Sequence, residues 1–181
     1  TKMGLSLGEY VVTEGGFGAD LGAEKFMNIK CRGTGISPTA IVLVATIRAL
    51  KYHGGQKLSE LTTENIPALE RGLPNLEKHL ESMRSFDLPV VVAINAFSSD
   101  TEQEVQFLKD HCKKLEVPVA FSNGWAGGGE ACAELAETVV EACGNSRRKY
   151  TPTYELEDST MEKMKKVAFN IYGAGEVVLS Q

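Results

Sequence analysis

The chain has 181 residues, of which 43% are hydrophobic, 24% charged and 7% aromatic, a composition typical of a soluble globular domain. Nineteen Lys and Arg residues against 24 Asp and Glu residues give a formal net charge of -5, which argues against a nucleic-acid partner. The longest apolar runs fall far short of the roughly 20 residues that a membrane-spanning helix needs, so we expect no membrane segment.

The four cysteines, Cys31, Cys112, Cys132 and Cys143, form no CxxC pair or other tight metal-ligand spacing. We therefore expect reduced thiols in a cytoplasmic compartment and no metal site. We expect no secretory signal, because the N-terminus lacks a charged start followed by an apolar stretch and a small-residue cleavage site, and the start at Thr1 without Met favours a processed chain or a piece of a longer protein.

Short apolar runs alternate with longer amphipathic ones, which predicts α/β architecture with a mostly parallel sheet and helices on both faces. The predicted strands are residues 9–13, 40–45, 88–95, 117–121 and 176–179. The predicted helices are residues 21–29, 101–115, 129–142 and 159–172. Between residues 63 and 86 we expect a short helix and a longer one, divided by Pro67 and Pro74. The strand at 40–45 is apolar on both faces, so we expect it in the centre of the sheet.

The chain is long enough for one sizeable core. Residues 1–144 are predicted to form the α/β unit, and residues 145–181, a loop, a helix and a strand, to continue the same domain or to start the next. Arg147, Arg148 and Lys149 are expected in a solvated loop, with contact to a polyanionic ligand tail as the alternative.

The strongest site signal is the glycine-rich stretch at residues 13–24, between the first predicted strand and the first predicted helix. Clustered glycines at a helix N-terminus let backbone N–H groups approach an anion, and the alternative is a tight turn that needs glycine for its backbone angles. A dinucleotide fingerprint fits poorly, because Gly22 falls one place late and the next strand ends without an acidic residue. The acids Glu14, Asp20 and Glu24 are expected to cap or solvate the helix start, and the alternative is that they ligate magnesium or act as bases. The sequence contains no GxxxxGK[ST] phosphate loop.

Aromatic residues mark two later strand ends. Phe97 follows the predicted strand 88–95, while Phe121 and Trp125 lie at the end of the strand 117–121 and in the loop after it. Rings on adjacent strand ends can face one another across a slot for a flat heteroaromatic ligand. The alternative is a minor core beneath the loops, which we favour for Phe97 taken alone, whereas ligand contact is favoured for Trp125. The histidines are scattered, and no nucleophile motif accompanies them.

Four blocks of sequence resemble the formate-tetrahydrofolate ligase family, in the family's order. They read YVVTEGGFGADLGAEKFMNIKCR, VLVATIRALKYHGG, VVVAINAFSSDTEQE and VPVAFSNGWAGGGEACAELA. The resemblance runs from about Leu7 to the end of the chain. It implies an enzyme of one-carbon metabolism that uses ATP to activate formate as formyl phosphate and then transfers the formyl group to N10 of tetrahydrofolate. It also implies a Rossmann-like or P-loop-NTPase-like three-layer fold, a cytoplasmic location, small-molecule partners and a homo-oligomer.

The resemblance also implies roles for particular residues. Phe97 and Trp125 correspond to the two aromatic residues that sandwich the folate ring, and Phe121 to an apolar neighbour of that slot. Gly16, Phe17 and Gly18 correspond to the edge of the cleft for formyl phosphate. These six residues are the site that the resemblance predicts.

Other parts of the family's site have no counterpart here. ATP and Mg²⁺ are implied as cosubstrates and tetrahydrofolate as substrate, with no bound prosthetic group and no metal site in this chain. The catalytic residues stay unassigned, since the family's phosphate-binding loop lies upstream of Thr1. Gly15 and Ser98 replace an alanine and a proline of the family pattern, and the loss of proline is expected to loosen the loop that presents Phe97.

We therefore expect a central fragment of such a ligase that keeps the folate-stacking wall, lacks the ATP machinery and is inactive alone. The alternative is a stand-alone folate- or nucleotide-binding module without catalysis. A nicotinamide-dependent oxidoreductase built on the Gly16 to Gly22 turn is disfavoured by the late glycine.

Overall fold

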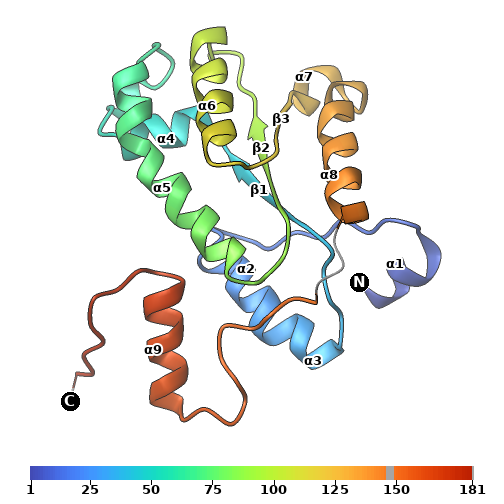
Figure 1. The fold of residues 1–181 in the computed structure, drawn as a ribbon. Helices are drawn as coiled ribbons and strands as arrows, with labels where there is room; N and C mark the ends of the chain where they lie inside the picture. The colour runs from blue at the N-terminus through green and yellow to red at the C-terminus, as the bar shows by residue number, and fades with distance from the viewer. Residues whose placement is uncertain (146–148, 181) are drawn as a thin grey trace.

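A sheet of three parallel strands forms the centre of the molecule in the computed structural model, which describes residues 1–145 and 149–180. The strands are β1 (Ile41–Ala45), β2 (Val90–Asn95) and β3 (Val119–Ser122), in that spatial order (Figure 1). Ala45 pairs with Ile94, and Asn95 pairs with Ser122. Because all three strands run the same way, their carboxyl ends lie at one edge of the sheet.

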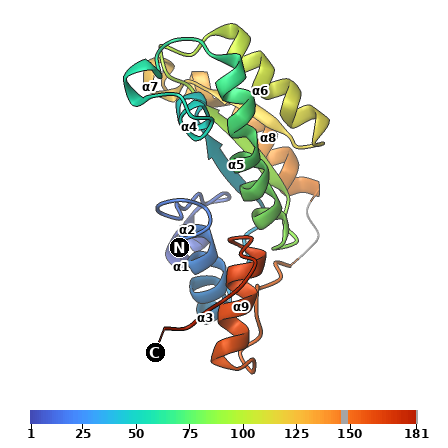
Figure 2. The same ribbon diagram turned by 90° about the vertical axis from the view of Figure 1, so that its left-hand side faces the viewer.

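Helices cover both faces of this sheet, which confirms the predicted α/β class. The helices and single turns are α1 (Lys2–Leu7), α2 (Gly22–Lys25), a π-helical turn (Phe26–Cys31), α3 (Arg32–Thr34), α4 (Ile47–His53), a 3-10 turn (Leu58–Glu60), α5 (Ile66–Arg84), α6 (Glu102–Lys114), α7 (Gly124–Gly127), a second 3-10 turn (Glu130–Cys132), α8 (Ala133–Asn145) and α9 (Thr160–Asn170). α5 and α6 lie on one face, and α8 packs on the other against β2 and β3 (Figures 1 and 2). Within the described residues, no helix is both long and apolar enough to cross a membrane.

β2 is the central strand, and five of its six residues are buried. β1 is an edge strand of the described sheet, so the prediction that residues 40–45 occupy its centre is wrong. Val42 and Val44 of β1 are 38% and 61% exposed. The physical reason is that α8 covers β2 and β3, which leaves one face of β1 open.

Two further strand predictions are wrong. Residues 9–13 and 176–179 form no strand, and Val12 and Val178 within them are 90% and 77% exposed. An apolar run becomes a strand only where a neighbouring strand accepts its backbone hydrogen bonds. Among the described residues neither segment has such a neighbour.

α5 is one continuous helix, so the predicted division at Pro74 is also wrong. Pro67 lies in its first turn, where no backbone donor is lost, but Pro74 lies inside it. The buried stripe that includes Leu69, Leu73 and Leu80 holds the helix against the core across the proline.

The segment after α8 packs against the first helices. α1, α2, α3 and α9 group below the strands in Figure 2, on the side away from α4 and α7. Ile171 is 1% exposed and belongs to the same core cluster as the sheet. The Thr153 N–H donates to Asn28 Oδ1 at 2.8 Å, and the Thr151 N–H donates to the Phe86 carbonyl at 2.9 Å.

Arg147 and Arg148, predicted in a solvated loop, lie outside the described residues.

Candidate functional site

The carboxyl edge of the sheet carries two of the predicted aromatic residues. Phe97 follows β2 by two residues, and Trp125 lies in α7, three residues after β3. The Ala96 N–H donates to the Ser122 carbonyl at 2.9 Å, which continues the pairing of the two segments past the strands. α7 accordingly lies at the carboxyl end of β3 (Figure 1). The structure thus brings Phe97 and Trp125 to the same edge.

Both of these rings are open to solvent. Phe97 is 41% exposed and Trp125 is 93% exposed, so the alternative that they pack in a minor core is wrong. The described residues contain no ring-to-ring contact between the two side chains. Phe121 is half-buried and packs against the core, and the Lys109 ammonium lies 6.0 Å from its ring centroid.

The loop between β2 and α6 forms a closed turn. The Phe97 N–H donates to Asp100 Oδ2 at 2.9 Å, and the Asp100 N–H donates to the Phe97 carbonyl at 3.0 Å. Burial raises the pKa of Asp100 above its ordinary value, while the hydrogen bond from Phe97 acts in the opposite direction. Thr101 then caps α6 in a reciprocal capping box with Glu104. These bonds hold the loop although Ser98 stands where a proline would stiffen it.

α4 contributes two cations to the surroundings of this loop, and neither was identified from the sequence. The Arg48 guanidinium carbon lies 5.0 Å from the Phe97 ring centroid. The Lys51 Nζ lies 2.8 Å from Glu104 Oε1, and both side chains are fully buried. The sequence contains a signal for this pair of cations, because Arg48 and Lys51 are three residues apart directly after an apolar strand run. The signal can be used only once residues 47–53 are known to form a helix.

Glycines shape the segment that carries Trp125. Gly128 has φ 62° and ψ -150°, a conformation that side chains with a Cβ rarely adopt. A Cβ at Gly124 would lie 2.7 Å from Cys132 Sγ, so this turn packs closely against the start of the following helical segment. The glycines therefore set the path of the backbone that presents Trp125.

The glycine-rich loop is built differently from the prediction. It joins α1 to α2 and does not follow a strand. Gly16 and Gly18 lack a positive φ, whereas Phe17 has φ 66° and is 94% exposed. Glycine is required instead at Gly22, where a Cβ would lie 1.7 Å from the Gly16 carbonyl oxygen. A non-glycine residue in the left-handed region is a feature of turns and of functional sites.

Glu24, one of the acids near this loop, is buried and bonded to neighbouring side chains. It is 2% exposed, it accepts a hydrogen bond from Asn28 Nδ2 at 2.9 Å, and it pairs with Lys25. Asn28 in turn donates to Thr153 Oγ1 at 3.0 Å. Glu24 therefore joins α2 to the segment before α9.

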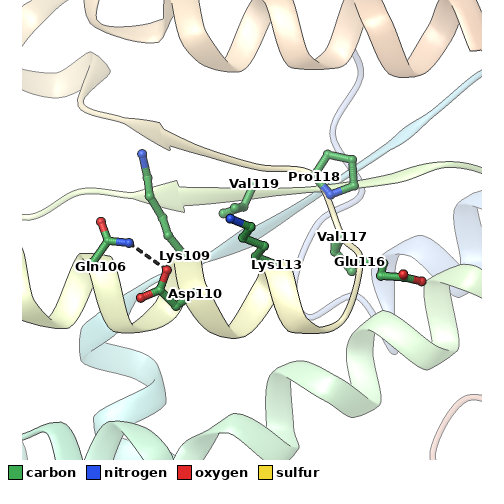
Figure 3. Close-up of a pocket in the computed structure, with 8 residues that line it drawn as sticks. All are labelled: Gln106, Lys109, Asp110, Lys113, Glu116, Val117, Pro118 and Val119. Atoms are coloured by element: carbon green, nitrogen blue, oxygen red, sulfur yellow. Dashed lines mark hydrogen bonds between the residues drawn. The ribbon is translucent and has the colours of Figure 1, made fainter.

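A shallow depression lies at the other end of β3, beside the last turns of α6 (Figure 3). Its lining residues are Gln106, Lys109, Asp110, Lys113, Glu116, Val117, Pro118 and Val119. The Gln106 side-chain amide donates to Asp110 Oδ1 at 2.9 Å, and Lys109 bonds to Glu134 at 3.1 Å. Gln106, Lys109 and Asp110 are thus already paired, and the depression is separate from the edge that carries Phe97 and Trp125.

A family model described as "Formate--tetrahydrofolate ligase" matches residues 1–181. The chain belongs to the formate-tetrahydrofolate ligase family. A formate-tetrahydrofolate ligase of Granulibacter bethesdensis (strain ATCC BAA-1260 / CGDNIH1) is 48% identical over 177 residues, which are 98% of this chain and 31% of that relative. The chain therefore spans less than a third of the length of this formate-tetrahydrofolate ligase, and the family resemblance seen in the sequence is confirmed.

Metal-binding clusters are not found among residues 1–145 and 149–180. No group of three or more His, Cys, Asp or Glu side chains there is arranged to hold a metal ion. All four cysteines are free thiols, with Cys31 and Cys112 buried.

Proposed function

We propose that this chain provides the tetrahydrofolate-binding wall of an enzyme that ligates formate to tetrahydrofolate at the expense of ATP. The product is 10-formyltetrahydrofolate, and the intermediate is formyl phosphate. The observation that carries the proposal is the position of Phe97 and Trp125, two exposed rings that are not in contact with each other, at the carboxyl edge of a parallel sheet. Ligands of open α/β sheets bind at this edge.

The aromatic residues bind and orient the pterin. A pterin is a flat heteroaromatic ring, and stacking on Phe97 and Trp125 buries both of its faces. Phe121, half-buried at the end of β3, adds an apolar neighbour. Fixing the ring in this way places N10 for attack on the carbonyl carbon of formyl phosphate, and orientation of this kind lowers the barrier of a reaction between two bound molecules. The new C–N bond forms as the C–O bond to phosphate breaks, phosphate leaves, and N10 loses its proton.

The glycine-rich loop is proposed as the edge of the formyl phosphate cleft. Gly16 has no heavy atom within 4 Å of the position of a Cβ, so the side of the loop where that Cβ would stand is open. Phe17, which is exposed and has a positive φ, is flanked there by Gly16 and Gly18. ATP and Mg²⁺ enter as cosubstrates, and their phosphate chemistry is not assigned to residues of this chain.

Further parts of the proposal concern the protein as a whole. We place it in the cytoplasm, where its free thiols stay reduced. We propose small molecules as its partners, without nucleic acid, a membrane or a bound prosthetic group, and a homo-oligomeric assembly. Residues 145–181 are proposed to continue the domain of residues 1–144, because Ile171 lies in the common core.

Steady-state kinetics of the natural polypeptide that contains these residues test the function. Phosphate release with ATP, Mg²⁺ and tetrahydrofolate should depend on formate and yield 10-formyltetrahydrofolate. Phe97→Ala and Trp125→Ala should each raise the KM for tetrahydrofolate by about tenfold and leave the KM for ATP unchanged. Tyr52→Ala, which removes an exposed aromatic side chain from α4, is the matched control and should change neither constant.

Two results would contradict the proposal. A Phe97→Ala, Trp125→Ala protein with an unchanged KM for tetrahydrofolate would exclude the aromatic wall. Folate binding without formate-dependent turnover would show a binding module in place of a ligase. The 181-residue chain alone should release no formate-dependent phosphate, and clear turnover by that chain would refute the assignment of phosphate handling to residues outside it.

A further inference from the structure

Arg48 contacts the aromatic wall from α4, a helix in which the resemblance assigns no site residue. α4 begins directly after β1, and Thr46 caps it by accepting a hydrogen bond from the Ala49 N–H at 3.2 Å. Arg48 lies in the first turn of this helix, at the carboxyl edge of the sheet. Its guanidinium carbon lies over the Phe97 ring, 5.0 Å from the centroid.

The structure gives this guanidinium a cation–π contact with Phe97, and its charge also acts to lower the pKa of Asp100 in the same loop. Among residues 1–145 and 149–180, the Arg48 side chain forms no hydrogen bond and no ion pair, although it is partly buried. A cation over an aromatic face is attracted by the negative potential of the ring. Phe97 is still 41% exposed, so a part of the ring that Arg48 does not cover is open to a ligand.

The position of Arg48 relative to the Phe97 loop is fixed by a second contact of the same helix. Lys51, three residues after Arg48, pairs at 2.8 Å with Glu104, and both side chains are fully buried. Glu104 belongs to the capping box that ends the loop at Thr101. The start of α4 is therefore held to the loop at Phe97 and to the beginning of α6 at Glu104.

We propose that Arg48 is a positioning residue of the tetrahydrofolate site, whose guanidinium holds the Phe97 ring in place on one side so that the uncovered part of the ring stacks on the pterin. This inference rests on the proposed function, because it requires that Phe97 contacts tetrahydrofolate. Arg48 acts through Phe97 and makes no contact with the ligand. A ring that is already held loses less side-chain freedom when the ligand binds.

Equilibrium dialysis of tetrahydrofolate against the natural polypeptide tests this role. Arg48→Met keeps a long apolar stem and removes the cation, and it should weaken binding by about two- to fivefold. Arg48→Lys, which restores a cation, should recover part of the loss. Arg84→Met is the matched control, because Arg84 bonds to the Leu115 carbonyl at 2.8 Å and has no contact with Phe97. It should leave the dissociation constant unchanged.

The decisive comparison is a double-mutant cycle. Phe97→Ala alone should weaken binding, and adding Arg48→Met to Phe97→Ala should then have no further effect, because Arg48 has no ring left to position. A purely structural role of Arg48 would give the same loss in both backgrounds. The melting temperature of each variant shows whether it is folded.

Four outcomes would overturn the inference. If Phe97→Ala weakens binding but Arg48→Met does not, the role of Arg48 fails and the proposed function stands. If Arg48→Met tightens binding, Arg48 occupies the ring face that the pterin needs. If the Arg48→Met effect is equal in both backgrounds, Arg48 acts independently of Phe97. If Phe97→Ala leaves binding unchanged, the proposed function fails and this inference fails with it.

Discussion

The buried ion pair between α4 and α6 gives a sharp prediction about stability. Lys51 and Glu104 are both fully buried, with 2.8 Å between Nζ and Oε1. Lys51 also donates to the Thr63 carbonyl at 2.9 Å, while Glu104 Oε1 accepts a hydrogen bond from the Asn65 N–H at 2.9 Å. The two charges thus join three segments, and removal of one charge leaves the other buried without its partner.

The expected loss of stability follows from the burial of the two charges. Breaking a buried pair by removing one partner costs about 3 to 5 kcal/mol, because an uncompensated charge remains away from water. Lys51→Met and Glu104→Gln should each fall in this range. The double variant leaves no buried charge, and Gln retains an oxygen for the Asn65 N–H. Its cost should therefore be smaller than the sum of the single costs by at least about 2 kcal/mol.

Urea unfolding followed by circular dichroism, with hydrogen exchange at the amides of α4 and α6, measures these differences. The pair Lys78–Glu81, in which Lys78 is half-buried and Glu81 is exposed, is the control, and Lys78→Met should cost less than about 1 kcal/mol. The reasoning is refuted if either single change at the buried pair costs no more than this control. Additive costs in the double variant would refute it as well.

Three further predictions follow from local geometry. Gly22→Ala should lower the free energy of unfolding by about 1 to 3 kcal/mol and reduce turnover, because its Cβ would lie 1.7 Å from the Gly16 carbonyl oxygen. The control Gly16→Ala should stay within about 0.5 kcal/mol of the parent, and thermal unfolding measures both variants. Burial raises the pKa of folded Asp100 above its ordinary value of 3.8, so its charged form costs stability at neutral pH and the cost disappears as the pH falls through that raised pKa. Asp100→Asn should therefore be more stable than the parent in urea at pH 7, with an advantage that shrinks toward pH 4, and an advantage that grows instead would contradict the sign. Burial raises the pKa of the Cys112 thiol to about 11, so labelling with a thiol reagent at pH 8 should modify half-buried Cys143 long before Cys112, and equal rates would contradict this.

Much of the sheet could be predicted from the sequence because its signals are local. β2 is a continuous apolar run, as expected for a strand covered on both faces, and α6 begins at Thr101 with Glu104 three residues later, as a capping box requires. The parallel order then placed Phe97 and Trp125 at one edge. These inferences needed only the pattern of neighbouring residues and the direction of the strands.

The errors arose where a distant partner decides the structure. Residues 9–13 have the composition of a strand, but a strand exists only with a neighbour, and local sequence does not show whether one is present. Pro74 breaks a helix hydrogen bond locally, yet the burial of the leucine stripe of α5 outweighs that loss. The Lys51–Glu104 pair joins residues 53 positions apart, and Arg48 reaches Phe97 across a similar span. Such pairs become visible only in the folded chain.

The central claim is that Phe97 and Trp125 form the pterin site. A structure of the natural polypeptide that contains these residues, with tetrahydrofolate bound, tests it most directly. The account predicts the pterin between Phe97 and Trp125, with its ring centroid about 4.5 to 7 Å from that of each side chain. Tetrahydrofolate bound elsewhere, with both rings free of contact to it, would contradict the account.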